Sequence, residues 1–156
     1  MDVFKDFIDF IELLQKYEVD YLIVGGYAVG LHSRPRATQD IDFWIRPSKE
    51  NAKNVIKVLI EFGFADVKLT IEELIDKDQL FILGRPPFRI DLLTSISGVQ
   101  FDEAFNNKFI HDFGSVKNVN FISYNDLINN KKASDRQKDK NDLDWIKTYG
   151  KNNQNI

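Results

Sequence analysis

Apolar residues recur along the chain with two different spacings, one typical of helices and one typical of strands. From Asp2 to about Lys16 they recur at helical spacing, which predicts a helix with one buried face. Further helices are predicted over residues 27–33 and 48–62, from residue 70, near residue 101, and over residues 124–132 and 135–149. Short apolar runs predict strands over residues 20–26, 40–45, 79–83 and 88–93, with weaker strands around residues 109 and 119.

Short motifs mark where several of these elements begin and end. Pro47 and Ser48 end one strand and open a helix, and Gly63 is placed to cap the end of that helix. The sequence TIEE, which starts at Thr70, matches a capping box. GRPP joins the runs QLFIL and FRIDLL, which predicts an antiparallel hairpin. These elements together indicate an α+β (mixed α/β) fold, with a mixed β-sheet flanked by helices and a helical C-terminal segment.

The length and composition narrow the class of protein. A chain of 156 residues suits one domain, predicted here over residues 1–150, with a low-complexity tail at 151–156 that we expect to fray. A net charge of −3 disfavours wholesale coating of nucleic acid through a basic surface. The chain has no cysteine, which excludes disulfides, thiolate metal sites and cysteine nucleophiles.

The same features predict a cytoplasmic protein. The sequence MDVFKDFIDF lacks the basic segment and apolar core of a secretory signal. The longest mostly apolar run, Tyr21 to Leu31, is too short to cross a bilayer as a helix, so no membrane association is expected.

Two aspartates interrupt the apolar run DIDFWI at the spacing of a β-strand. Because side chains two residues apart point to the same face of a strand, Asp40 and Asp42 are expected to stand side by side. Like charges so close are unfavourable unless a cation lies between them. Asp91 lies in a second strand-like run, FRIDLL. If the two strands are neighbours, the three carboxylates converge.

A cluster of carboxylates without cysteine suits oxygen-seeking Mg²⁺ or Mn²⁺ rather than zinc. Gly25 and Gly26 stand between a predicted strand and a predicted helix, where the backbone can approach a phosphate closely. A nucleoside triphosphate held there, with two ions on the aspartates, would be placed for in-line attack on phosphorus.

These segments resemble the nucleotidyltransferase superfamily, whose members have a DNA polymerase β-like fold. The resemblance lies in GGYAVGLHSRPRATQDID, which matches the pattern of a glycine pair followed by Asp-X-Asp, and in RIDLL, which supplies a later aspartate. Small bacterial members, including minimal nucleotidyltransferases and AbiEii-type toxins, look similar. A distal segment, LINNKKASDRQKDKNDL, is similar to a later pattern in such proteins, in which Lys131, Arg136, Lys138, Asp139 and Asp142 find counterparts.

The resemblance implies a role for each matching residue. It makes Asp40, Asp42 and Asp91 the metal ligands and catalytic residues, with Asp91 also the general base. The nucleotide-binding residues that it implies are Gly25, Gly26, Arg36, Thr38, Lys131 and Arg136. The implied activity is the metal-dependent transfer of a nucleoside monophosphate from an NTP to an acceptor hydroxyl, with release of pyrophosphate. The acceptor stays open between a small molecule, a protein side chain and an RNA end, and a small partner protein or a second copy could complete the site.

Other interpretations remain open for parts of this pattern. A nucleotide-binding module of a toxin-antitoxin or regulatory pair, with weak or no turnover, is favoured by Tyr27, because many catalytic members carry Ser or Thr close after the first glycine. Read individually, Gly25 and Gly26 could simply end a strand, and the basic residues after Lys131 could form a solvated helix face. A dinucleotide-binding oxidoreductase is disfavoured, because the glycines of GGYAVG do not have the required spacing.

Overall fold

The computed structural model describes residues 3–85 and 87–151. The helices are α1 (Val3–Lys16), α2 (Gly25–His32), α3 (Lys49–Phe62), η1 (Ala65–Val67, a 3₁₀ turn), α4 (Ile71–Ile75), α5 (Phe101–Asn106), α6 (Tyr124–Ala133) and α7 (Gln137–Tyr149). The strands are β1 (Tyr21–Val24), β2 (Asp40–Ile45), β3 (Leu80–Arg85), β4 (Phe88–Leu93), β5 (Phe109–Phe113) and β6 (Val116–Phe121).

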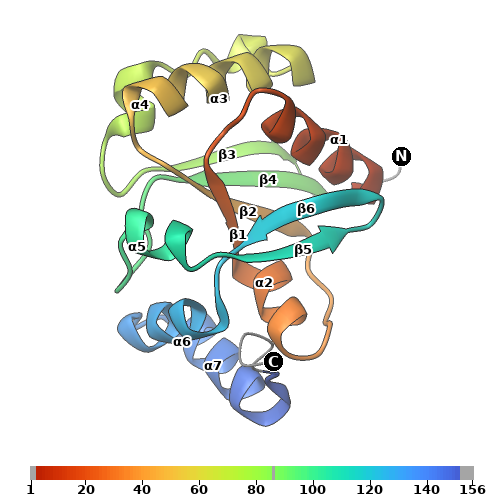
Figure 1. The fold of residues 1–156 in the computed structure, drawn as a ribbon, viewed down its shortest axis with the longest axis vertical. Helices are drawn as coiled ribbons and strands as arrows, with labels where there is room; N and C mark the ends of the chain where they lie inside the picture. The colour runs from red at the N-terminus through yellow and green to blue at the C-terminus, as the bar shows by residue number, and fades with distance from the viewer. Residues whose placement is uncertain (1–2, 86, 152–156) are drawn as a thin grey trace.

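The strands form one mixed sheet in the order β3-β4-β2-β1-β6-β5 (Figure 1). β2 pairs in parallel with β4 and antiparallel with β1, while β1 pairs in parallel with β6. The outer strands β3 and β5 each close an antiparallel hairpin, with β4 and β6 respectively. The predicted α+β class and the predicted hairpin around GRPP are therefore confirmed, although residue 86 within that turn lies outside the described residues.

The two faces of β2 have opposite chemistry, and this difference positions the site. Ile41, Phe43 and Ile45 are fully buried on one face. The Phe43 ring packs 5.3 Å from that of Phe10 on α1, so this face is the one that the helix covers. Because side chains alternate along a strand, Asp40 and Asp42 lie on the opposite face.

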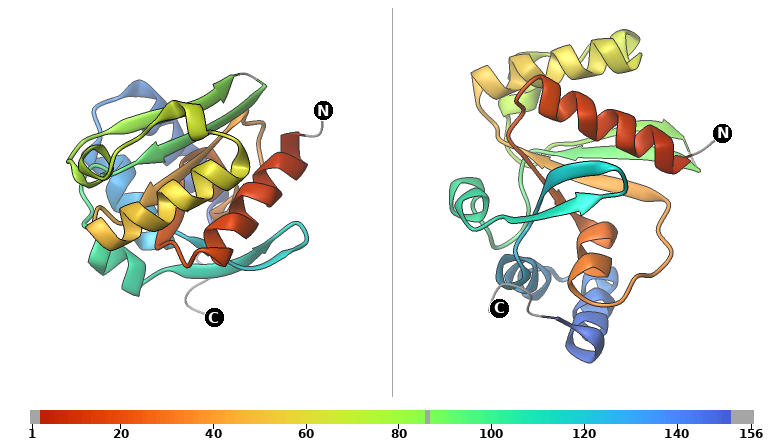
Figure 2. Two further views of the ribbon diagram at one scale, coloured as in Figure 1. Left: turned by 90° about the horizontal axis from the view of Figure 1, so that it is seen from above. Right: turned by 45° about the vertical axis from the view of Figure 1, so that its right-hand side comes forward.

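Helices cover the two faces of the sheet unequally. α1 and α3 lie side by side over the apolar face, as Figure 2 shows. α2, α6 and α7 contact one another on the other side of the molecule, and the views show them together below the sheet (Figures 1 and 2). α5 reaches the acidic face at one end, where Phe101 packs edge-on against Trp44 with ring centroids 5.1 Å apart. The carboxylates of β2 lie on the face between α5 and the group formed by α2, α6 and α7.

The structure corrects two predicted boundaries. The glycine pair was predicted to end the first strand, but β1 ends at Val24 and both glycines form the start of α2. The backbone turns here because Gly25 has a φ of +69°. The last helix was predicted from residue 135, but it begins at Gln137, since Arg136 is extended and serves as its N-cap. The predicted start of the first helix at Asp2 lies outside the described residues.

Lys151, the last described residue, lies beside α2. The Lys151 backbone N–H donates to the His32 carbonyl oxygen at 2.7 Å. The rest of the tail predicted to fray, residues 152–156, is outside the described part of the chain. Among residues 3–85 and 87–151, no helix is both long enough and apolar enough to span a membrane.

We expect Gly63→Ala to lower the free energy of unfolding by about 1–2 kcal/mol. Gly63 caps α3 in the left-handed region, with φ +109°, and an added methyl group would meet nothing within 4 Å. The loss would therefore come from backbone conformation alone. Urea unfolding measures it, with Gly63→Asn as the control, because Asn tolerates this region better than Ala. Equal stability of Gly63→Ala and wild type would contradict this account.

Candidate active site

Three aspartate side chains converge on the open face of the sheet. β2 and β4 are parallel neighbours, and their register places Asp42 directly opposite Asp91. Asp40 lies two residues before Asp42 on the same face. One carboxylate oxygen from each residue lies within 4.8 Å of the other two. The predicted convergence of the three aspartates is therefore confirmed.

The donor set fits a divalent cation that prefers oxygen. Asp91 is buried, while Asp40 and Asp42 are partly exposed, so the cluster reaches solvent through the two aspartates of β2. All three groups offer carboxylate oxygens, and their spacing suits ligation of shared ions of the Mg²⁺ or Mn²⁺ type.

The glycine pair is required by close packing against this acidic strand. A Cβ added to Gly25 would lie 2.0 Å from Asp42 Oδ2, a distance that no real atom pair tolerates. At Gly26, an added Cβ would lie 2.9 Å from Thr38 Oγ1. The first turn of α2 therefore lies directly against Asp42 on one side and Thr38 on the other. Val24, the N-cap of α2, offers no side-chain hydrogen bond to this turn, which leaves its N–H groups available to an anion.

The crowding of carboxylates changes the proton affinity of the central one. Burial, followed by the negative charges of Asp40 and Asp91, raises the pKa of Asp42 to about 7. The positive charge of Lys138 opposes this shift. In the absence of divalent cations, Asp42 therefore carries a proton over much of the range below neutral pH.

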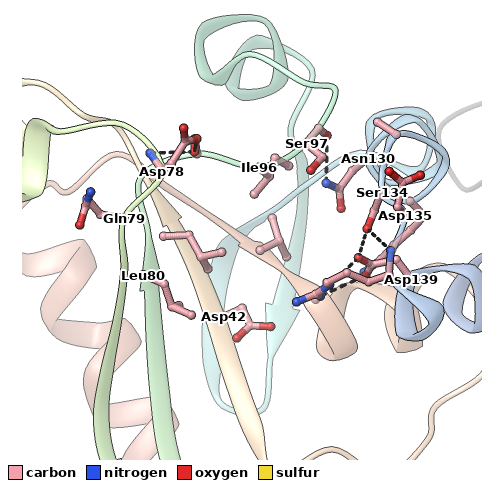
Figure 3. A pocket seen from close by; sticks show the side chains of 17 residues that line it. Asp42, Asp78, Gln79, Leu80, Ile96, Ser97, Asn130, Ser134, Asp135 and Asp139 are labelled. Carbon is pink, nitrogen blue, oxygen red and sulfur yellow. Dashed lines mark hydrogen bonds and ion pairs between the residues drawn. The ribbon is translucent and has the colours of Figure 1, made fainter.

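A first cavity of about 550 Å³ opens beside Asp42 (Figure 3). It lies between the start of α2, the β3 side of the sheet, and the α6–α7 connection. Its apolar wall includes Leu80, Leu93 and Ile96. The residues that line it are Val24, Gly25, Asp42, Asp78, Gln79, Leu80, Leu93, Ser95, Ile96, Ser97, Asn130, Lys131, Ala133, Ser134, Asp135, Arg136 and Asp139.

A second cavity, of about 610 Å³, lies on the Asp40 side of the cluster. Most of the residues that line it have polar or charged side chains, and they come from α2, the loop before β2, the start of β2, and α7. The residues that line it are Gly26, Arg36, Ala37, Thr38, Gln39, Asp40, Lys138, Asn141 and Asp142. The residues predicted to bind nucleotide are thus divided: Gly25, Lys131 and Arg136 line the first cavity, while Gly26, Arg36 and Thr38 line the second.

A buried ion network connects the two cavities. Lys131 Nζ lies 2.9 Å from Asp139 Oδ1 and 3.0 Å from Asp142 Oδ2, and all three side chains are almost fully buried. Arg36, in the loop before β2, pairs with the same Asp142. Arg136 donates to Asp139 from the solvent side at 3.0 Å. Lys131 and Arg136 therefore face the first cavity while each is already engaged by aspartate.

This network lowers the pKa of both Lys131 and Asp139, for different reasons. Burial lowers the pKa of Lys131, against the effect of its hydrogen bond to Asp139. Burial works to raise the pKa of Asp139, but hydrogen bonds from Arg136, Ser134 and Lys131 hold that pKa well below its usual range. Asp139 is therefore a permanent anion that fixes the position of the two cations.

Tyr27 points away from both cavities. Its ring packs edge-on against Phe7, with centroids 5.9 Å apart, and lies 5.4 Å from the ring of Phe113. At Gly26, the position before Tyr27, Thr38 occupies the space that a serine side chain would need. Neither position therefore offers the hydroxyl of a serine or threonine to this turn, and a phosphate would be bound here through the backbone.

Sequence reasoning did not identify Arg89 as a site residue. Its guanidinium donates to both oxygens of Asp91, with Nε 2.9 Å from Oδ1 and Nη2 3.0 Å from Oδ2. The signal was present, because Arg89 stands two residues before Asp91 and so shares its face of the strand. Ser97 and Asn130, which hydrogen-bond across the rim of the first cavity, had no such signal.

The protonation of Asp42 predicts a pH-dependent stability. Because its pKa is raised to about 7 in the folded protein, ionisation of Asp42 destabilises the fold progressively between about pH 4 and pH 7. We expect Asp42→Asn to remove this loss. Between pH 5 and pH 8, without divalent cations, its free energy of unfolding should gain about 2 kcal/mol relative to wild type.

Urea unfolding of both proteins at the two pH values, with a chelator present, measures this gain. Asp144→Asn is the matched control, because Asp144 is exposed on α7. A difference between Asp42→Asn and wild type that is the same at both pH values would contradict the shifted pKa.

Removal of the central cation from the ion network should destabilise the fold. We expect Lys131→Met to cost about 3 kcal/mol in free energy of unfolding, because Asp139 and Asp142 would stay buried with one partner fewer. The neighbouring Lys132 is exposed, so Lys132→Met should change the stability by no more than about 0.5 kcal/mol. Equal stability of the two variants in urea unfolding would show that the network contributes nothing.

Comparison with known proteins places this site in a family. No curated protein matches the chain. A family model described as "Nucleotidyltransferase of unknown function (DUF6036)" matches residues 2–153, which include all three aspartates, the glycine pair and the ion network. This chain belongs to that family of nucleotidyltransferases of unknown function.

Proposed function

We propose that this protein transfers a nucleoside monophosphate from a nucleoside triphosphate to an acceptor hydroxyl, with release of pyrophosphate. The observation that carries the proposal is the convergence of three carboxylates, of which Asp42 lines the first cavity and Asp40 lines the second. The family description supports the general class of transferase. A cytoplasmic location, suggested by the absence of cysteine, is part of the proposal.

The first cavity is the site proposed for the nucleotide. It combines the uncapped first turn of α2 at Gly25 with two cations, Lys131 and Arg136, and these features favour a polyphosphate. Leu80 and Leu93 give the same cavity an apolar wall, against which a nucleobase can pack. Asp42 lies at its edge, so the phosphates would adjoin the carboxylate cluster.

Asp40, Asp42 and Asp91 are the residues proposed to hold divalent cations of the Mg²⁺ or Mn²⁺ type. When bound, two such ions would activate the acceptor oxygen and stabilise the charge on the leaving pyrophosphate. Asp91 is the proposed general base, because it is the buried carboxylate of the cluster and can take the proton of the acceptor hydroxyl. Lys131 and Arg136 would hold the departing phosphates.

The second cavity is the site proposed for the acceptor. It is lined by Asp40, whereas the first cavity is lined by Asp42, so a hydroxyl placed there would also adjoin the carboxylate cluster. Lys138, Asn141 and Thr38 offer donors for a polar group. A small molecule, a protein side chain and an RNA end all present such a group, and a small partner protein or a second copy of the chain could supply it.

The second candidate function is a nucleotide-binding module with weak or no turnover. Two observations favour it. The residues that follow the glycine pair supply no hydroxyl, since Tyr27 points into the core. In addition, Arg89 occupies the carboxylate of Asp91 that would serve as the base. Such a module would share nucleotide binding with the enzyme and differ from it only in the chemical step.

We expect the wild-type protein to melt at a higher temperature when a nucleoside triphosphate and Mg²⁺ are both present. Ligand binding to the folded state alone stabilises by about 2.7 kcal/mol at a hundredfold excess over Kd. Neither component by itself should give the full shift. Asp42→Asn should lose the shift, since the ions that bridge protein and phosphates would lose a ligand, whereas the exposed Asp144→Asn should retain it.

Each of the four common ribonucleoside triphosphates is tested in turn by thermal denaturation. A shift that appears equally in Asp42→Asn would mean that nucleotide binds elsewhere, and no shift with any triphosphate would reject the proposal for the isolated chain. For a triphosphate that does bind, release of labelled pyrophosphate in the presence of candidate acceptors (small molecules with hydroxyl groups, proteins and RNA ends) separates the enzyme from the module. The module would stabilise on binding but release none.

A further inference from the structure

The pairing of Arg89 with Asp91 is a contact of the cluster that the proposed reaction does not use. The guanidinium makes two parallel hydrogen bonds, 2.9 and 3.0 Å long, to the two oxygens of the carboxylate. The Asp91 side chain is 7% exposed and the Arg89 side chain 33% exposed. This bidentate geometry is the strongest form of an arginine–carboxylate pair.

The position of Arg89 brings its charge close to all three aspartates. In the register of the sheet, Arg89 lies opposite Asp40 on β2 and opposite Gly84 on β3. A guanidinium stays protonated in proteins, so this positive charge lies permanently on the face where the carboxylates gather.

Arg89 and a metal ion at Asp91 compete for the same carboxylate. The two hydrogen bonds use both oxygens of Asp91, and a divalent cation bound there would lie within a few ångströms of a positive guanidinium. Among the described residues, Asp40 and Asp42 form no ion pair of this kind. Asp40 and Asp42 are thus open to a divalent cation, whereas Asp91 is occupied by the guanidinium of Arg89.

We propose that Arg89 is an internal counter-ion that takes the place of a metal ion at Asp91, so that the cluster binds one divalent cation readily and a second only after Arg89 releases Asp91. The inference rests on the metal centre of the proposed function. It makes Arg89 a positioning residue, which controls whether Asp91 is available as ligand and base.

The surroundings of Arg89 permit this release. A third of its side chain is exposed, so the guanidinium can turn outward into solvent without passing through the protein interior. Gly84, its neighbour across β3, has no side chain to hold it in place. A bound triphosphate offers phosphate oxygens as an alternative partner for the guanidinium. The arrival of the nucleotide would then couple the release of Asp91 to binding of the second ion.

Mn²⁺ alone, titrated into the full chain without nucleotide, tests the inference. The electron paramagnetic resonance signal of the free ion gives the number and affinity of bound ions. We expect wild type to bind one ion well and a second weakly, and Arg89→Gln to bind the weaker ion about tenfold more tightly. Arg85→Gln removes the same charge from an exposed residue of the same hairpin and should change the affinity less than about twofold.

A second variant guards against misfolding of the first. Arg89→Lys keeps the charge but not the two parallel hydrogen bonds, and it should raise the affinity of the weaker ion by about threefold. Thermal denaturation reports the same competition, because Mn²⁺ should stabilise Arg89→Gln more than wild type. Unchanged or weaker Mn²⁺ binding in both variants would overturn the inference.

Asp42→Asn separates failure of the inference from failure of the proposed function. If Mn²⁺ binding requires Asp42 but does not respond to substitution of Arg89, the metal centre stands and the role of Arg89 is rejected. If wild type and both Arg89 variants bind no Mn²⁺, the metal centre and the inference fail together.

Discussion

Mutual repulsion among three carboxylates within 4.8 Å of one another is the constraint around which this structure is built. Such a cluster is unfavourable unless its charges are reduced or matched. The protein does both: Asp42 takes up a proton near neutral pH, and Arg89 pairs with Asp91. Burial of apolar side chains on the opposite face offsets the remaining repulsion. Ile41 and Phe43 are fully buried there, and Phe43 packs against Phe10 of α1. The stability of this apolar layer thus compensates for an acidic cluster that is unfavourable by itself.

The C-terminal helices have a structural role in this arrangement as well as a chemical one. The network around Lys131 joins α6 to α7, and the pair of Arg36 with Asp142 joins α7 to the loop that leads into β2. The walls of both cavities are therefore linked through one buried group of charges. Asp139 and Asp142 neutralise the cations Lys131, Arg36 and Arg136. These side chains can therefore line the cavities near the acidic cluster without pairing with its carboxylates. The proposed separation of nucleotide and acceptor depends on this link.

The glycine pair illustrates how one short motif serves packing and chemistry together. Gly25 and Gly26 are needed because Asp42 and Thr38 occupy the space that side chains would fill. The same contact places unsatisfied N–H groups of α2 beside the carboxylates. A phosphate bound at this turn would therefore lie next to metal ligands as a direct result of the close packing.

Local patterns in the sequence were sufficient to predict much of this structure. Strand period placed Asp40 and Asp42 on one face, and capping residues set the ends of the helix that Ser48 and Gly63 enclose, because these features depend only on neighbours in the chain. The pairing of Arg89 with Asp91 has the same local origin and was open to the same reasoning.

The tertiary structure decided the features that depend on contacts between distant segments. Asp42 stands beside Asp91 because β2 pairs in parallel with β4. A shift of β4 by one residue would have turned Asp91 to the apolar face that α1 covers. The division of the candidate nucleotide-binding residues between two cavities arises where α2, the loop before β2, and α7 meet. The burial of Lys131 likewise depends on aspartates 8 and 11 residues away along the chain, which only the packing of α7 on α6 brings within reach. Periodicity carries no information about such contacts, because they are set by how whole elements pack.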